Sequence, residues 1–349
     1  MHCSWRGLCA LCVGTTSRRR PSLTSARPHP VLAIAGHEYR SATRSRVLLV
    51  LVLGMVIVAG ASITIASYDF KAQLADYNSY VAQARAAGVT VTAAPQLFPL
   101  QLLRPVIEYV QIIGAVLAIG LGYLTVARER TGNTLALLLT RPVRSTDIML
   151  GRLLGAGALI ATILGATAII SVLLIGVLGG TWLGGGELIR LAITFVTGSL
   201  YMLIFYALGV WLSARSRALV NGLVVALVTW LMVVLIIPQI GDTMDPDNQV
   251  PGGLFAALQV QKADEKKVLA HFSTYERLRN DLEETSLTKH FERFTFAVTG
   301  IKDKYNGVSL TTIAADKRGD IAWLGAYSAL LAALMWSGIR REGVTGKDN

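Results

Sequence analysis

Six long apolar stretches occupy most of this chain and limit the folds that are open to it. Each has about the 20 residues that a helix needs to cross the hydrocarbon core of a bilayer. Only 16% of the 349 residues are charged, against about a quarter in soluble domains. The sequence therefore predicts an all-α polytopic membrane protein. Its six transmembrane helices are expected at residues 47–66, 106–127, 153–179, 188–213, 219–240 and 321–339.

The remaining segments define the expected domain organisation. The chain divides into a disordered N-terminal tail (1–30), an interfacial amphipathic helix (31–46), transmembrane helices one to five (47–240), an extracytoplasmic helical module (241–320), and a sixth transmembrane helix with a cytoplasmic tail (321–349). The polar stretch 67–104 is expected to be an outer loop.

The net charge of +11 is unevenly distributed along the chain. With the N-terminus inside, the inner segments hold 18 Lys and Arg, whereas the two shorter outer loops hold 4. Excess Lys and Arg marks cytoplasmic loops, so we expect a plasma-membrane protein with both termini in the cytoplasm. The basic balance is thus a topology signal, and nucleic acid is not an expected partner.

Two features precede the first apolar stretch. Cys9 and Cys12 form a C-x-x-C pair that either binds metal or cycles its redox state, or belongs to an unstructured tail. We favour the tail and expect no metal site, because zinc prefers four ligands and no second pair follows. In residues 31–46, apolar residues alternate with Glu38 and three arginines. This pattern is typical of a helix lying on membrane lipids, and it is equally compatible with a plain juxtamembrane anchor.

The connector between the second and third apolar stretches has an unusual composition. Residues 127–155 read ARERTGNTLALLLTRPVRSTDIMLGRLLG. Arginines flank the apolar run Leu135–Leu139, and Arg141-Pro142 ends it. A simple loop between two spans would not need five apolar residues in a row. We interpret residues 128–152 as a segment that lies at the membrane surface and is contacted by another protein.

This connector resembles the cytoplasmic coupling segment of type-2 ABC exporter permeases. The family pattern is Glu, then Gly-Thr, a leucine run, Arg-Pro-Val and finally Leu-Gly-Arg/Lys-Leu-Gly. In this chain the last motif is Leu150–Gly155. The chain departs from the pattern at Asn133, which stands between Gly132 and Thr134. The resemblance implies that a separate cytoplasmic ABC ATPase subunit docks on residues 128–152. The residues that it assigns to this contact are Glu129, Gly132, Thr134, Leu135, Leu138, Arg141, Pro142 and Arg144.

The resemblance also implies the composition of the complex. The chain would be a permease subunit that pairs with a second permease subunit, identical or different, and moves a substrate outward by alternating access. ATP and Mg²⁺ would be bound by the ATPase subunit, and no cofactor by this chain. The long segment between spans five and six is similar to that of the branch associated with maturation of multicopper enzymes.

Polar and small residues inside the apolar stretches have two possible roles each. Glu108 is an intramembrane ionisable residue and so a functional candidate, but Arg104, four residues earlier, favours a structural ion pair. Hydroxyl groups in spans either line a path or satisfy carbonyls of their own helix. The candidate substrate-path residues are Glu108, Gln111, Thr194, Thr197 and Tyr201. Small residues at four-residue spacing predict close helix packing; these are Gly151, Gly155, Gly157, Ala161 and Gly165.

The segment between spans five and six predicts two charged helices, at residues 263–285 and 287–301. Apolar residues recur at three- and four-residue spacing in the first of these. In the second, Phe291, Phe294 and Phe296 are expected either against the membrane or against the first helix. We expect a small helical module rather than an enzyme domain.

No catalytic motif accompanies these features. The sequence contains no G-x-x-x-x-G-K-[ST] phosphate loop, no H-E-x-x-H and no G-x-S-x-G, and its five histidines are scattered. We therefore expect no enzyme activity in this chain. The hypothesis from another class is a membrane scaffold or assembly factor whose extracytoplasmic module holds a partner protein.

Overall fold

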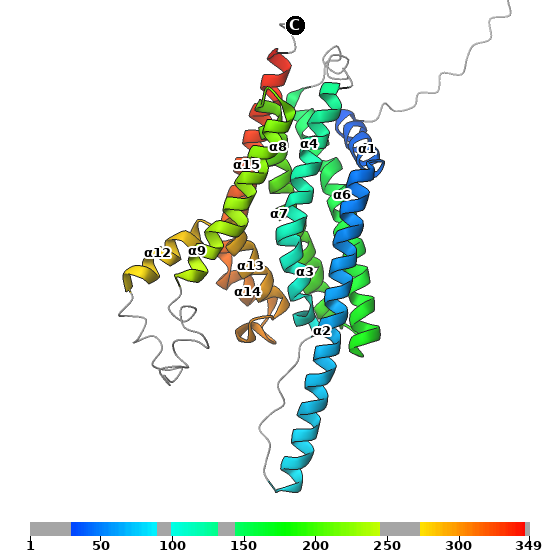
Figure 1. Cartoon of the computed structure of the whole chain (residues 1–349), viewed down its shortest axis with the longest axis vertical. Helices are drawn as coiled ribbons and strands as arrows, with labels where there is room; N and C mark the ends of the chain where they lie inside the picture. Colours follow the sequence, from blue (N-terminus) through cyan, green and yellow to red (C-terminus); the bar gives the residue numbers. More distant parts are fainter. Residues whose placement is uncertain (1–28, 89–98, 132–143, 245–272, 346–349) are drawn as a thin grey trace, which may run out of the picture.

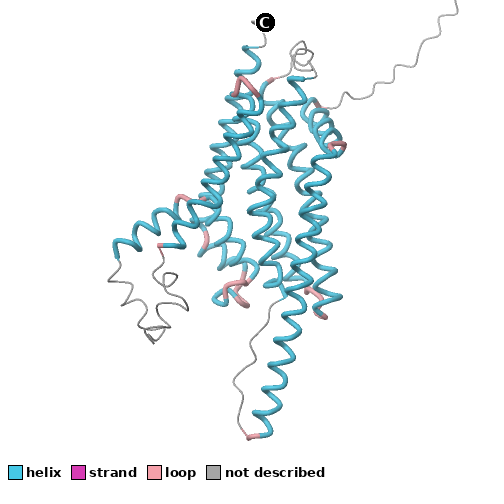
Figure 2. Tube along the Cα trace, in the orientation of Figure 1, coloured by secondary structure: helices cyan, strands magenta, loops and turns pink. Residues whose placement is uncertain are grey.

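Helices make up the protein throughout the part that the structure, a computed structural model, describes: residues 29–88, 99–131, 144–244 and 273–345. No strand occurs in these ranges, and Figure 2 shows helices joined by short connections. Six of the helical segments are long and apolar enough to cross a membrane. The predicted fold class and the number of spans are therefore confirmed.

The spans are built from the following elements. The first is α2 (Arg46–Ala86); the second comprises η1 (Pro99–Leu103), α3 (Arg104–Tyr109), η2 (Val110–Gly114) and α4 (Ala115–Thr131); the third is α6 (Ser145–Leu174) with η3 (Ile175–Gly179); the fourth is α7 (Gly185–Arg215); the fifth comprises α8 (Leu219–Trp230), η4 (Leu231–Ile236) and α9 (Ile237–Thr243); the sixth is α15 (Arg318–Thr345). The helix α1 (Pro30–Thr43) precedes them, and α12 (Ser273–Glu284), α13 (Leu287–Thr299), η6 (Asp303–Tyr305) and α14 (Leu310–Asp316) lie between the fifth and sixth spans.

The bundle has two distinct ends. The helix α1, the last residues of α4, the first residues of α6 and the last residues of α15 lie at the end drawn uppermost in Figure 1, which we name the terminal end. The helices α12, α13 and α14 lie toward the opposite end, which we name the module end. The chain therefore starts and finishes its described course at the same end of the bundle.

The helix α2 is much longer than the sequence predicted. It runs without a break over 41 residues to Ala86 and projects beyond the bundle at the module end (Figure 1). The expectation of a loop from residue 67 is therefore wrong for residues 67–86. Hydropathy ends a span where polarity begins, but this stretch contains neither Gly nor Pro, so nothing stops the helix. It ends before Gly88, whose φ of +72° suits a residue that follows a helix terminus.

The helix α7 is the centre of the bundle. Its buried face packs against α4, α6, α8, α13 and α15. Gly122 of α4 and Gly209 of α7 allow the closest approach: a Cβ on Gly122 would lie 2.5 Å from the carbonyl oxygen of Tyr206, and one on Gly209 would lie 2.6 Å from that of Ile119. Such small residues let helix backbones approach closely in lipid. Neither glycine was predicted from the sequence, because the crossing of α4 and α7 joins segments that are far apart in the chain.

The small residues predicted on the third span separate into two groups. A Cβ on Gly151 or on Gly155 would lie 2.7 Å from atoms of α1, so these two glycines pack α6 against α1. Gly157 is in ordinary contact with Leu203 of α7, at 3.5 Å. Ala161 is exposed, and a Cβ on Gly165 would have no neighbour within 4 Å. Within the described residues, the last two therefore make no close helix contact.

The helix α13 is placed differently from either expectation. Ten of its 13 residues are buried, and it packs against α7, α15 and η4 (Figure 1). Phe291 stacks on Tyr201 of α7 with ring centroids 4.5 Å apart. Phe294 clusters with residues of α14 and with Ile193 of α7, and the ring of Phe296 lies beside Arg104 of α3. The three phenylalanines thus face the bundle and α14, where apolar and aromatic side chains surround them.

Candidate functional site

The residues assigned to ATPase coupling lie at the terminal end of the bundle. Gly132, Thr134, Leu135, Leu138, Arg141 and Pro142 fall outside the described residues. Glu129, in the last turn of α4, and Arg144, which precedes α6, lie on either side of that segment. The described part of the site is therefore its base, where the chain leaves the second span and enters the third.

Four charged side chains from three helices meet at this base. We call them the charge cluster: Glu38 of α1, Arg128 and Glu129 of α4, and Arg152 of α6. Arg152 forms an ion pair with Glu129, and its side chain is only 1% exposed, while that of Glu129 is 13% exposed. This pair joins the two helices that flank the connector.

Arg128 links the same region to α1. Its Nη1 donates a hydrogen bond to the Ser41 hydroxyl, and its Nη2 lies 3.7 Å from Glu38 Oε2. Thr125, one turn earlier on α4, donates to Glu38 Oε2 over 3.3 Å. The α1 helix, already packed on α6 through two glycines, is thus also hydrogen-bonded and ion-paired to α4.

Arg130 connects α4 to a fourth helix. Its two terminal nitrogens donate to the carbonyl oxygens of Ser216 and Ala214, each over 2.8 Å. These carbonyls stand at the C-terminus of α7, where helical acceptors have no partner in the helix and a cation is favourable. The end of α4 is therefore bound to α1, α6 and α7 at once.

The electrostatics of the cluster are balanced. Two arginines face two glutamates, and burial raises the pKa of the Glu38 carboxyl although Arg152 and Arg128 oppose that shift. Removing one member of a buried group of charges leaves an uncompensated partner. Glu129 consequently holds the base of the connector in place rather than facing outward, and its part in contacting an ATPase subunit stays a prediction.

Sequence reasoning missed three members of this site: Glu38, Arg130 and Arg152. Arg152 was taken as part of the re-entry motif Leu150–Gly155, and Glu38 as one polar residue of a surface helix. The available signal was the position of Arg152, which lies within a run of apolar and small residues, because a buried cation requires a nearby anion.

Two of the predicted substrate-path residues lie together at the contact with α13. Gln111 is buried, and its amide nitrogen donates to the carbonyl oxygen of Thr288 over 3.1 Å. The Tyr201 hydroxyl donates to the carbonyl oxygen of Gln111, also over 3.1 Å. Both side chains are therefore engaged in holding α13 against the bundle.

The other three are engaged locally. Thr194 and Thr197 donate to the carbonyl oxygens of Arg190 and Ile193, one turn back on α7. Their hydroxyls thus satisfy carbonyls of their own helix, and a role in a substrate path stays a prediction. Glu108 pairs with Arg104 at 3.0 Å, as the four-residue spacing predicted. The cavity beside Thr194 has a volume of only about 10 Å³, so α3, α7 and α13 meet there without an open passage.

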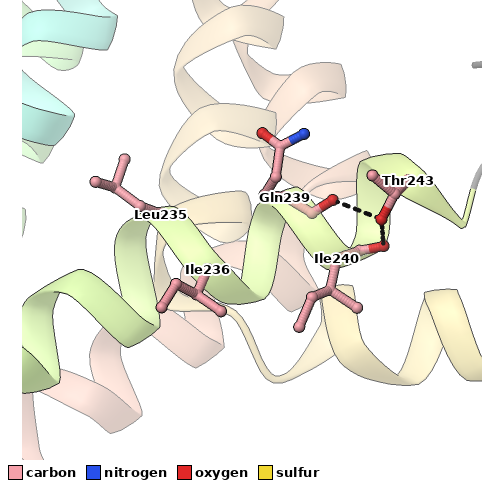
Figure 3. Close-up of a pocket in the computed structure, with 5 residues that line it drawn as sticks. All are labelled: Leu235, Ile236, Gln239, Ile240 and Thr243. Carbon is pink, nitrogen blue, oxygen red and sulfur yellow. Dashed lines mark hydrogen bonds between the residues drawn. The ribbon is translucent and has the colours of Figure 1, made fainter.

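Larger hollows among the described residues lie elsewhere. One, of about 360 Å³, is bordered by five residues of the fifth span, Leu235, Ile236, Gln239, Ile240 and Thr243. Figure 3 shows that all five come from one continuous helix and that the Thr243 hydroxyl bonds to carbonyls of that helix. It is an open apolar groove with few polar groups, unlike a specific ligand site. A second hollow, of about 260 Å³, lies between the start of α7 and the α13–α14 connection.

These features define a class of protein: a multi-pass membrane subunit with a closed bundle and a braced connector at one end. The sequence matches the ABC-2 family transporter protein over residues 32–334, which is most of the chain. The chain therefore belongs to the ABC-2 transporter family and is a membrane subunit of an ABC transporter. A comparison with curated proteins returned no match.

Proposed function

We propose that this chain is an exporter permease whose ATPase subunit docks on residues 128–152. Members of the ABC-2 family are membrane subunits without ATPase activity of their own and work with an ATPase partner. The finer assignment, to export and to this docking segment, rests on the resemblance of the connector to the coupling segment of type-2 exporters. ATP and Mg²⁺ then belong to the partner subunit.

The observation that supports this proposal most is the attachment of the connector base. The contacts Glu129–Arg152, Arg128–Glu38 and Arg130 with the end of α7 bind the residues at the end of α4 to three other helices. A displacement of the connector by a closing ATPase subunit would be passed to the bundle through Arg128, Glu129 and Arg130 on the α4 side and through Arg152 on the α6 side. A loop that only joined two spans would not need this bracing.

Three further parts of the proposal follow from the same function. The terminal end faces the cytoplasm, as the excess of Lys and Arg there favours. A second permease subunit, identical or different, completes the complex. The branch associated with multicopper-enzyme maturation is the hypothesis for the substrate system, and it rests on the long segment that contains α12–α14. The scaffold hypothesis has no observation of its own in its favour, since the chain belongs to a transporter family.

Site-specific cross-linking tests the docking site. A photo-crosslinking amino acid in place of Leu138 should capture the ATPase subunit, whereas the same group in place of Leu278, an exposed residue of α12, should not. Capture at Leu278 alone, or none at Leu138 while the ATPase subunit still copurifies, would contradict the proposal.

A further inference from the structure

His290 is the most unusual ionisable residue of the module end. Its side chain is 1% exposed, and it stacks on Trp323 of α15 with ring centroids 5.6 Å apart. Its Nδ1 lies 2.7 Å from Asp320 Oδ1, and its Nε2 lies 2.7 Å from the carbonyl oxygen of Glu284. One imidazole therefore connects α12, α13 and α15.

Both groups that face the ring are hydrogen-bond acceptors. A neutral histidine carries one N–H and one lone pair, and only the imidazolium donates from both nitrogens. A neutral His290 beside an ionised Asp320 would place a lone pair against the carboxylate in one tautomer, or against the carbonyl oxygen of Glu284 in the other. To donate to both acceptors, the ring must carry a proton on each nitrogen, which makes it an imidazolium.

Other charged groups near this contact are arranged in pairs. Lys317, just before α15, lies 3.4 Å from the second oxygen of Asp320. On α12 and α13, Arg293 pairs with Glu283 at 2.5 Å and with Glu284 at 3.5 Å. Toward α7 and α3, the charged contacts of α13 are at its other end, where Arg190 donates to the carbonyl oxygen of Val298 and Arg104 lies over Phe296.

The rest of the α13 attachment does not depend on a proton that exchanges near neutral pH. Gln111 donates to a carbonyl oxygen, and Phe291 stacks on Tyr201. Partial burial raises the pKa of Glu283, but Arg293 together with Lys289 and Arg279 outweighs it, and the net pKa is below the usual value. Glu283 is therefore ionised throughout the near-neutral pH range and remains so to lower pH than an ordinary glutamate. The imidazole of His290, by contrast, can exist with or without its second ring proton.

We propose that protonated His290 holds α13 in the closed bundle, and that loss of this proton releases α13 from α7 and α15. The module end then carries a proton-binding site that controls whether the space between α3, α7 and α13 is sealed. Because α13 fills that space with Phe291, its release would expose Tyr201 and Gln111. This inference does not rest on ATPase docking, and its test requires no ATPase subunit.

Cysteine accessibility in the detergent-purified full chain tests the proposal. All three native cysteines, Cys3, Cys9 and Cys12, are first replaced by serine. The reporter is Thr288→Cys, on α13, where the side chain is 4% exposed. The reference is Leu278→Cys, on α12, where it is 54% exposed. Dividing the two maleimide labelling rates removes the effect of pH on the thiol itself.

The ratio should rise at least tenfold between about pH 5.5 and about pH 8.5 if one proton is lost on opening. The matched variant is Asp320→Asn: its amide can donate to the lone pair of a neutral His290 while His290 still donates to Glu284, so the ratio should stay low and flat. His290→Phe keeps the stack on Trp323 but removes both N–H groups, so its ratio should be high at every pH.

Two results would overturn the proposal. A flat ratio in the parent protein would mean that α13 does not respond to a proton. An equal rise in Asp320→Asn would mean that another group responds to pH. The first candidate would then be Lys302, since burial and the nearby Lys317 lower its pKa. If His290→Phe fails to fold, Asp320→Asn still tests the proposal, because it changes the partner of the same proton and leaves the imidazole ring in place.

Discussion

The terminal end and the module end are both held by buried polar contacts, but of different chemistry. At the terminal end, the charge cluster pairs arginines, which keep their charge at all ordinary pH values, with Glu38 and Glu129. At the module end, α13 is attached to η2, α7 and α15 through the Gln111 hydrogen bond, the Phe291–Tyr201 stack and the His290–Asp320 pair, beside a hydrogen bond from Arg190 to the carbonyl oxygen of Val298. Burial alone therefore does not decide how firmly a region is fixed. The comparison suggests a braced end that transmits force and a second end that can be released.

Removing Arg152 should have the largest effect, because it breaks the braced end. Arg152→Met leaves Glu129 without its partner in a buried position, and breaking such a pair costs about 3–5 kcal/mol. We expect a clearly lower melting temperature in detergent and a lower yield of folded protein. The matched control is Arg144→Met, since Arg144 is exposed beside the same connector. Equal melting of both variants would show that the Glu129–Arg152 pair does not stabilise the terminal end.

Because Glu129 belongs to the charge cluster, a Glu129 variant is a poor test of ATPase docking. Glu129→Lys would place a further positive charge beside Arg152 and weaken the cluster, so that a loss of ATPase binding in that variant would not isolate the docking contact. Substitutions in the connector itself, such as Leu138→Asp, avoid this problem because they lie beyond the charge cluster.

The contact between α4 and α7 should show the next largest effect. The helix α7 contributes Tyr201 to the module end, and its C-terminus is bound by Arg130 at the terminal end, so Gly209 lies between the two regions. Gly209→Ala would put a Cβ 2.6 Å from the Ile119 carbonyl oxygen, and overpacking of this kind costs about 1–3 kcal/mol. Thermal unfolding should detect it. Gly165→Ala is the matched control, expected to leave stability unchanged or slightly higher, and equal losses in both would contradict the packing described.

The smallest effect is expected from Glu108→Gln. The Arg104–Glu108 pair is exposed on both sides, and such pairs contribute about 0–1 kcal/mol, so the melting temperature should hardly change. This variant separates the two hypotheses for Glu108. Unchanged transport would support the structural ion pair, whereas loss of transport in a stable protein would support a role in the substrate path.

The sequence predicted those parts of the fold that depend on hydropathy and short-range spacing. It found the six spans, because they depend on hydropathy alone, and the Arg104–Glu108 pair, because its two members are one helical turn apart. It failed for residues 67–86, where a helix continues beyond the apolar region. It also failed for Gly122 and Gly209, because which helices cross is a long-range property.

The candidate site shows the same limit. The connector was identified from its own pattern, but Glu38 and Arg152 lie 114 residues apart in the sequence and meet only in the folded bundle. Likewise, nothing local to His290 indicates that α15 supplies Asp320. Partners of this kind could not have been predicted from one sequence, since periodicity says which face is buried and not what covers it.

The most direct test of the account compares Leu138→Asp with Leu278→Asp in the complex with the ATPase subunit. Both variants also carry the reporter substitution Thr288→Cys. Two quantities are measured: the amount of ATPase subunit that copurifies, and the change in maleimide labelling of the reporter when ATP is trapped. We expect Leu138→Asp to lose about nine-tenths or more of the ATPase subunit, since burying a leucine on docking would contribute about 1.5–3 kcal/mol. The variant should also lose the ATP-dependent change in labelling. Leu278→Asp should retain both. If Leu138→Asp matches the parent in recovery and in ATP response, the connector is not the docking site.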